Sequence, residues 1–317
     1  MAFQLKSSES LSDGITRNVK SQIEMVLEQV RAKSKPRQRD ALHAEAVHEI
    51  RKSFKRIRAA LRLVRDELGN DVYHDENWNF RDAARPVSEV RDAVVLVEAM
   101  DKLAGQLAKA IEPEAFTRLR EALLANQREV ARRVIDDEKA FTSVEEEAAR
   151  ALARVPDWTI ERDGWVAIES GLRRVYRRGH RGLALASAQP TVPNLHEWRK
   201  QANYLWHQLQ LLEASWTAAQ QKLVDQIHAL STLLGDDHDL AVLRETLATD
   251  PLSYGGQRVL KDVFAVIDAR RAQLERQAFV LGRKLYKDSP ESFASRIEGY
   301  FTGKPVKPRS RRRLVAR

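Results

Sequence analysis

The stretch VHEIRKSFKRIRAALRL, residues 47–63, decides the fold, because its opening recurs as LHEWRK at residues 195–200. The two copies lie 148 residues apart. On a helical wheel at about 100° per residue, apolar side chains of the first copy gather in one arc and mostly positive ones fill the opposite arc. The apolar arc holds Ile50, Phe54, Ile57, Leu61, Val64 and Leu68, and the opposite arc holds His48, Arg51, Lys52, Lys55, Ala59 and Arg62. This pattern predicts an amphipathic helix with a cationic face.

The second copy divides in the same way. Its apolar arc holds Leu195, Trp198, Ala202, Leu205, Leu209 and Leu212, and the opposite arc holds His196, Arg199, Lys200, Asn203, His207 and Gln210. One such helix alone is typical of a solvated surface. Two copies with a histidine at the same first position indicate a shared site.

Length and periodicity predict the fold class. A chain of 317 residues suggests two units of about 150 residues, and the repeat makes the same division. No period-two run of β-branched residues bounded by turns is present, so the predicted fold is all-α, with two pseudo-symmetric antiparallel helical bundles. The predicted divisions are a flexible N-terminus at 1–10, a first half at 11–150, a second half at 151–303 and a disordered basic tail at 304–317.

The charge of the chain is unevenly distributed. The formal net charge is +9, but residues 304–317 contain seven lysines and arginines and no acid. Without those seven, 47 basic residues face 45 acidic ones, a net charge of +2. An anion site in the body must therefore come from the segregation of charge onto particular helix faces.

Composition also bounds the compartment. The chain has no cysteine, which excludes disulfides, thiolate metal sites and a cysteine nucleophile, and favours a reducing cytoplasm. No apolar run approaches the ~20 residues of a membrane span, and the N-terminal residues lack a signal-peptide core. We expect a cytoplasmic protein without membrane contact.

Two further stretches repeat between the halves. The arginine-rich stretch at 171–181 matches the region that begins at residue 14, so that Arg174 corresponds to Arg17 and Arg177 to Lys20. Residues 234–243 align with 87–96, which matches Asp239 with Asp92. The same alignment sets Arg91 against His238.

Enzyme motifs are incomplete in this sequence. A His-Glu-x-x-His zinc motif fails, because Lys52 and Lys200 stand where the second histidine would be. The run Asp236 to Asp239, with His238 inside it, resembles part of a metal-dependent phosphohydrolase. Its counterpart in the first half carries Arg91 in place of that histidine. We therefore expect no catalytic residue, cofactor or metal, and keep a phosphohydrolase as the alternative.

The cationic arcs suit a linear, densely charged anion. Arginine offers a planar fork to phosphate oxygens, lysine offers a compact charge, and successive helical turns present them about 5.4 Å apart. Proteins that bind single-stranded nucleic acid interleave aromatic side chains with such a groove. Here Phe54, Tyr176, Trp198 and Trp206 fall on or beside the apolar arcs, and only Tyr204 borders the cationic one. A phosphate chain without bases fits better than a nucleic acid, which is the third possibility.

The paired His-Glu-x-Arg-Lys helices, the arginine-rich helix before the second pair, and the aligned stretches at 87–96 and 234–243 resemble the CHAD family, the conserved histidine α-helical domain. The resemblance covers roughly residues 10–300. It implies two helical bundles around a basic central channel that binds inorganic polyphosphate without catalysis, with an association with polyphosphate granules. The implied contacts are His48, Arg51, Lys52, Lys55, Arg62, Arg174, Arg177, Arg178, His196, Arg199, Lys200 and His207, with Arg17 and Lys20 added through the repeat. The oligomeric state is not predicted.

This chain departs from the family pattern in its second half. Asn203 and Gln210 stand where the first half has Lys55 and Arg62, so the second cationic row is thinner. His48 and His196 begin the two arcs, and imidazole has a reference pKa of ~6.5. We therefore expect a bound polyanion to draw both histidines toward the protonated state and binding to tighten as pH falls from about 8 to 6.

Overall fold

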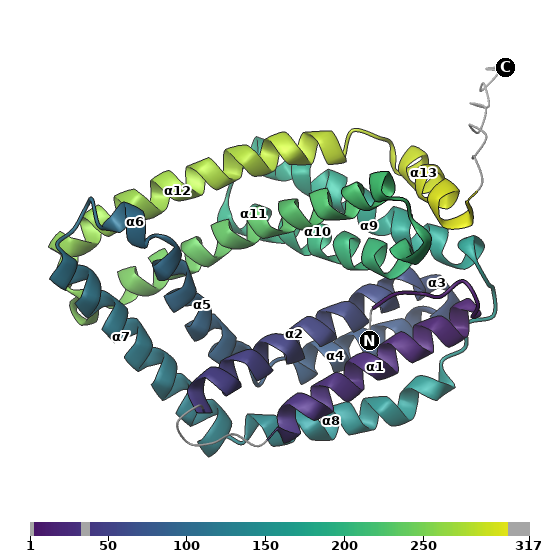
Figure 1. Cartoon of the computed structure of the whole chain (residues 1–317), viewed down its shortest axis with the longest axis horizontal. Coiled ribbons are helices and arrows are strands. Elements are labelled where there is room, and N and C mark those ends of the chain that lie inside the picture. The colour runs from purple at the N-terminus through teal and green to yellow at the C-terminus, as the bar shows by residue number, and fades with distance from the viewer. Residues whose placement is uncertain (1–2, 33–38, 304–317) are drawn as a thin grey trace.

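The computed structural model describes residues 3–32 and 39–303, and every regular element within them is a helix (Figure 1). The first half contains α1 (Leu11–Arg31), α2 (Arg39–Leu63), α3 (Arg65–Leu68), α4 (Asn70–Ala83), α5 (Ser88–Lys102), α6 (Ala104–Leu107), α7 (Pro113–Ala131) and α8 (Ala140–Arg154). The second half contains α9 (Trp165–Ala188), α10 (Val192–Leu212), α11 (Ala218–Thr249), α12 (Gly256–Leu285) and α13 (Pro290–Thr302). The all-α prediction is confirmed for these ranges. The predicted disordered tail at 304–317 lies outside the described residues.

Two of the predicted divisions differ from the structure. Within the end predicted as flexible, Phe3 and Leu5 are buried, and the Leu5 N–H donates to the Leu211 carbonyl at 2.8 Å. The Phe3 ring also lies 5.4 Å from the Arg56 guanidinium of α2, so the segment is held against both halves. Helix α8 continues through residue 150, so the connection between the halves follows at residues 155–164.

The order of helix contacts recurs in the two halves. Helix α1 packs on α2 and α8, whereas α9 packs on α10 and α13; α5 packs on α7, and α11 on α12. With the 148-residue offset, α11 corresponds to α4 and α5 together. Pro86 lies between α4 and α5 and cannot supply a backbone N–H, which interrupts the helix in the first half only. The pseudo-symmetry itself stays a prediction.

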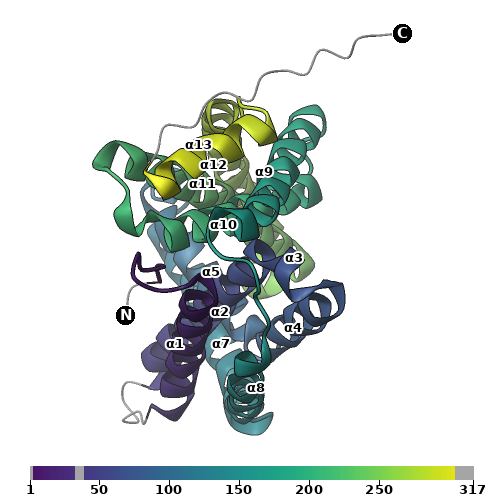
Figure 2. The same cartoon turned by 90° about the vertical axis from the view of Figure 1, so that its right-hand side faces the viewer.

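The buried apolar side chains form two clusters, and each joins the two halves. The larger one includes Phe54 and Trp198, from the two signature helices, and reaches α1, α4, α8, α9 and α13. The smaller one joins α5, α6 and α7 to the C-terminal part of α11 and to residues 260–274 of α12. Helices α2 and α10 pack against each other (Figure 2). There Gln208 Nε2 donates to the Ala59 carbonyl at 3.2 Å. The two halves are therefore not separate bodies.

The approach of α9 to α2 depends on Gly171. A Cβ atom there would lie 2.0 Å from the Leu63 carbonyl oxygen and 2.6 Å from that of Arg62. Since both neighbours are backbone atoms, we expect Gly171→Ala to lower the free energy of unfolding by about 3 kcal/mol or more. Gly105→Ala is the matched control, because nothing lies within 4 Å of its added Cβ. Urea unfolding measures both; equal stability of the two variants would contradict this packing.

Candidate anion-binding site

Four cationic side chains lie close together where α2, α5, α10 and α11 meet. Arg51 and Lys55 come from α2, Arg91 from α5 and Arg199 from α10; we call them the cation cluster. The wheel periodicity places Arg51 and Lys55 one turn apart on α2, and the packing of α2 against α5 and α10 brings the other two guanidinium groups to them. The structure thus joins three residues predicted from the sequence with one that was not predicted.

Lys55 is the least compensated member of the cluster. Its side chain is exposed and has no hydrogen-bond or ion-pair partner in the described part of the chain. Desolvation by the surrounding protein, followed by repulsion from Arg199, Arg51 and Arg91, lowers the pKa of Lys55 to about 8. The attraction of Asp239 opposes this shift only in part.

Arg51 is held in place by a hydrogen bond and keeps one guanidinium N–H without an acceptor among the described residues. One terminal nitrogen donates to Ser88 Oγ, whose hydroxyl donates to the Ala84 carbonyl at 2.9 Å. Its Nε is buried and has no partner among the described residues. Burial lowers the pKa of Arg51, and the nearby Asp92 opposes that effect. A buried guanidinium N–H without an acceptor favours the binding of an anion.

The carboxylates near the cation cluster neutralise its positive charge only weakly. Arg199 Nη2 lies 4.0 Å from Asp239 Oδ1, at the limit of an ion pair. Burial raises the pKa of Asp239, although Arg199 counteracts it. Asp92 is the other nearby carboxylate. Together with Glu98, which is bonded to Arg91, three acids therefore face the four cations.

Arg91 is the site residue that the sequence analysis did not assign. Its two terminal nitrogens donate to the Glu98 carboxylate at 3.0 and 2.9 Å, and it repels both Arg51 and Lys55. The signal that could have found it is the alignment of 87–96 with 234–243. In that alignment Arg91 directly precedes Asp92, which is matched with Asp239.

The signature histidines lie at the margin of the cluster and favour the neutral form. Burial and the charge of Arg91 lower the pKa of His48, and burial and Arg199 lower that of His196. The His196 ring is 4.5 Å from the His238 ring, and burial brings the pKa of His238 to about 4. In each half, the signature histidine thus lies near a residue of the other repeated stretch: His48 near Arg91, and His196 beside His238.

Lys52 and Lys200 are each bonded to the glutamate three residues earlier. Lys52 Nζ donates to Glu49 at 2.9 Å, and Lys200 Nζ donates to Glu197 at 2.6 Å. Both lysines keep solvent exposure. Each can contribute charge to the site at the cost of its ion pair.

Arg62 and Arg174 fasten helices together. The Arg62 guanidinium stacks 3.9 Å from the centre of the Tyr204 ring and so ties α2 to α10. Arg174 donates to Asp66 of α3 at 2.8 and 3.0 Å. Arg177 and Arg178 are exposed on α9, and Arg178, one turn after Arg174, shares its face.

The two predicted residues of α1 do not join the cluster through any interaction found in the described ranges. Arg17 donates to the Glu9 carboxylate at 2.8 Å and to the Gln4 carbonyl at 2.9 Å. Lys20 is half-buried one turn further along the same helix. Arg17 therefore stabilises the packed N-terminal segment.

His207 corrects the wheel interpretation. Its side chain is 1% exposed and its ring stacks 4.4 Å from that of Trp206, so it is not available to a ligand. The wheel placed it correctly on α10, but the packing of α10 against α2 and α11 buries its side chain. Only the N-terminal turns of the two polar arcs reach the cation cluster.

The burial of His207 has a consequence for acid stability. Burial lowers the pKa of His207 to about 3. Between pH 6.5 and pH 3 this histidine therefore binds a proton in the unfolded chain but not in the folded one, so the free energy of unfolding falls as pH falls. We expect the loss of unfolding free energy between pH 7 and 4.5 to be about 3 kcal/mol smaller in His207→Gln than in the unaltered protein. His180→Gln, at an exposed position, serves as the control. Equal pH dependence of the two variants would refute the assignment.

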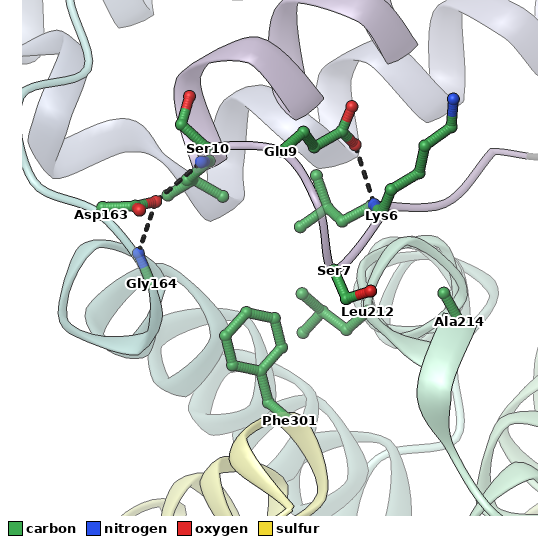
Figure 3. Close-up of a pocket in the computed structure, with 11 residues that line it drawn as sticks. Lys6, Ser7, Glu9, Ser10, Asp163, Gly164, Leu212, Ala214 and Phe301 are labelled. Atoms are coloured by element: carbon green, nitrogen blue, oxygen red, sulfur yellow. Dashed lines mark hydrogen bonds between the residues drawn. The ribbon is translucent and has the colours of Figure 1, made fainter.

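A cavity of about 300 Å³ lies elsewhere, between the N-terminal segment, the start of α9 and the ends of α10 and α13 (Figure 3). Its lining includes Leu212 and Phe301. Asp163 Oδ1 accepts from the backbone N–H of Leu11 at 2.7 Å and of Gly164 at 2.8 Å. Since its charged groups include carboxylates that are already bonded, the cavity does not resemble a phosphate site.

Comparison with known proteins agrees with this geometry. The chain is an all-helical protein with a cationic site between two repeated helices, and the family model of the CHAD domain matches residues 21–248. The chain belongs to the CHAD domain family. A solved structure, the crystal structure of the CHAD domain from the plant Ricinus communis, matches with 15% identity over 96% of each chain and a TM-score of 0.49. The comparison with curated proteins gives no match.

Within residues 3–32 and 39–303, each helix is too short or too polar to span a membrane. In the same ranges, no group of three or more histidine, aspartate or glutamate side chains is arranged to hold a metal ion.

Proposed function

We propose that this protein binds inorganic polyphosphate at the cation cluster without catalysing a reaction on it. The observation that carries the proposal is Lys55, an exposed ammonium group that has no partner among the described residues and is repelled by Arg51, Arg91 and Arg199. A bound phosphate chain would replace mutual repulsion with charge-assisted hydrogen bonds to all four groups. The family resemblance implies the same ligand.

The arrangement favours a phosphate chain over a nucleic acid. The aromatic rings beside the site serve the protein interior: Trp198 is fully buried and Tyr204 is covered by Arg62. Neither offers a free face on which a base could stack, and stacking supplies ~1–3 kcal/mol per base in proteins that bind single strands. Affinity from guanidinium and ammonium groups alone is better matched by a chain made only of phosphates.

The test is a titration of polyphosphate and of single-stranded DNA of equal charge, at matched salt. We expect polyphosphate to bind at least tenfold more tightly and its affinity to fall steeply as salt rises, because neutralising several phosphates releases their counterions. Equal affinity for the DNA would support the nucleic-acid alternative, and a flat salt dependence would contradict the site.

The phosphohydrolase alternative retains one supporting observation. His238 and Asp239 both lie at the margin of the cluster, next to His196 and Arg199 respectively. Release of phosphate from polyphosphate, measured with and without added divalent metal, decides between the two functions. Release that is lost in His238→Gln would establish the enzyme.

A further inference from the structure

The outer surface of α9 and α12 carries six cations that do not belong to the cation cluster. All six are exposed, and none of them bonds to a carboxylate within residues 3–32 and 39–303. We call them the outer basic face: Arg177 and Arg181 of α9, Arg276, Arg283 and Lys284 of α12, and Lys287 just after α12. The sequence analysis named only Arg177 among them. Their charges are therefore available to an anion that arrives from solvent.

The sequence supplies this surface with few acids. Residues 171–188 contain five arginines and no acid, and residues 276–287 contain four lysines and arginines and no acid. The acids next to these stretches are engaged by arginines outside the outer basic face: Glu169 at 3.4 Å, Glu275 at 3.6 Å and Asp288 at 2.9 Å. Helix α13, which also packs on α9, brings two glutamates. The cations thus outnumber the acids around them.

The close approach of α9 to the end of α12 joins these cations into one surface. A Cβ atom at Gly179 of α9 would lie 2.4 Å from Tyr286 Oη, so only glycine fits there without a shift of that ring. The rings of Tyr176 and Tyr286 are 5.1 Å apart. Because Arg177 directly follows Tyr176, and Lys287 directly follows Tyr286, cations from both segments flank the same contact.

The outer basic face lies one helix away from the cation cluster, and Trp198 of α10 spans that distance. A Cβ atom at Gly182 of α9 would lie 3.1 Å from Trp198 Cα, and one at Gly282 of α12 would lie 2.5 Å from the Trp198 ring. The next residue of α10 is Arg199, a member of the cluster. Axes of packed helices are about 8–10 Å apart, so a flexible polyanion bound at the cluster can continue over α9 and α12.

We propose that the outer basic face is a second contact for the polyphosphate chain, so that this protein binds long chains more tightly than short ones. The inference rests on the proposed function, because it extends the ligand of the cation cluster. A chain held at the cluster meets the second contact at the high local concentration that its own connecting phosphates set. A short chain such as tripolyphosphate fills only one of the two sites.

The side chains around the outer basic face favour a phosphate chain as the occupant. The rings of Tyr176 and Tyr286 are buried, so they offer no free surface on which a nucleic-acid base could stack. The exposed aliphatic residues on these helices, Leu185 and Val280, are isolated, whereas a membrane-surface helix presents a continuous apolar face. Charge without apolar or aromatic surface matches a ligand made only of phosphates.

The experiment titrates the full chain with tripolyphosphate and with a long, size-fractionated polyphosphate at the same salt concentration. The face variant combines Arg181→Gln, Arg283→Gln and Lys284→Gln. We expect it to bind the long chain about tenfold more weakly and with a smaller salt dependence, because three phosphate contacts are lost. Its affinity for tripolyphosphate should change by no more than about twofold, since screening weakens the field of distant charges.

The matched control combines Arg118→Gln, Lys222→Gln and Arg258→Gln, three exposed cations on α7, α11 and the start of α12. We expect it to keep its affinity for both ligands within about twofold. Equal losses in the face and control variants, or equal losses for short and long chains in the face variant, would overturn the second contact. Melting temperatures confirm that both variants fold.

Two further arms separate the alternatives. Replacement of Arg51 and Arg199 by glutamine should weaken tripolyphosphate binding more strongly than long-chain binding, which keeps the outer basic face. If this double variant bound both ligands normally while the face variant lost the long chain, the cluster would be refuted and the outer basic face retained. If the face variant lost binding to phosphatidylserine vesicles but kept its affinity for the long chain, a membrane would be the partner and the proposal would be wrong.

Discussion

Replacement of Arg51 and Arg199 together by glutamine is expected to weaken polyphosphate binding by about 100-fold or more. These two arginines are the repeat-related members of the cluster, and a hydrogen bond to a charged group contributes about 1.5–3 kcal/mol. Loss of two such contacts costs about 3–6 kcal/mol, which corresponds to at least a hundredfold in Kd. Isothermal titration calorimetry with a defined chain length measures the change.

The matched control removes the same charge from other places. Arg120→Gln combined with Arg244→Gln deletes two guanidinium groups that pair with Asp101 and Asp268 on the surface. We expect this variant to lose no more than about threefold in affinity, through the weak long-range field. Equal losses in the two double variants would show that binding depends on net charge and not on the cluster. Melting temperatures confirm that both variants fold.

The second large effect is the pH dependence of binding. Burial and the three guanidinium groups lower the pKa of Lys55 to about 8, and a bound polyanion should return it toward its ordinary value. Below pH 8 the ammonium form is present before binding; above it, binding must take up a proton. The affinity is therefore expected to fall about tenfold between pH 7 and 9, with proton uptake visible in two buffers of different ionisation enthalpy.

Lys55→Arg is the decisive variant for this effect. It keeps the positive charge but does not lose its proton in the measured range, so the pH response should flatten while binding is largely retained. Lys55→Gln should flatten it and also weaken binding. If the pH dependence of binding is unchanged in Lys55→Arg, the group that titrates must be another residue.

The sequence analysis assigned this response to His48 and His196, and the structure changes that expectation. Neighbouring cations and burial lower the pKa of both imidazoles, which moves their protonation to more acidic pH. Whether a polyanion reverses this shift stays a prediction. The sequence gives no reason to expect Lys55 to titrate near neutrality, because a sequence does not reveal which charges will crowd one amine.

The repeat and the helical periodicity predicted the class of fold and the helices of the cluster. Side-chain spacing of 3.6 residues is a local property, so the sequence alone places Arg51 and Lys55 on one face of α2. The same reasoning failed for His207, because a wheel shows which residues share a face and not which other helix covers it. The crossing of α2 over α10 is a tertiary contact between segments about 150 residues apart.

The partners of individual arginines were the second feature that the sequence did not predict. Arg17, Arg62 and Arg174 belong to the cationic patterns, yet each is engaged by a specific neighbour: Glu9, the Tyr204 ring and Asp66. Those partners are distant in the sequence or lie in segments without a motif. Arg91 was the opposite case, since it lies inside a repeated stretch but has no basic counterpart in the other half.

The most direct test of the central claim is to locate the ligand on the protein. Arginine modification by phenylglyoxal, read by peptide mass spectrometry with and without polyphosphate, reports which guanidinium groups become covered. We expect protection of Arg51, Arg91 and Arg199, with Arg120 and Arg244 modified equally in both conditions. Protection spread evenly over all five, or confined to arginines outside the cluster, would contradict that claim.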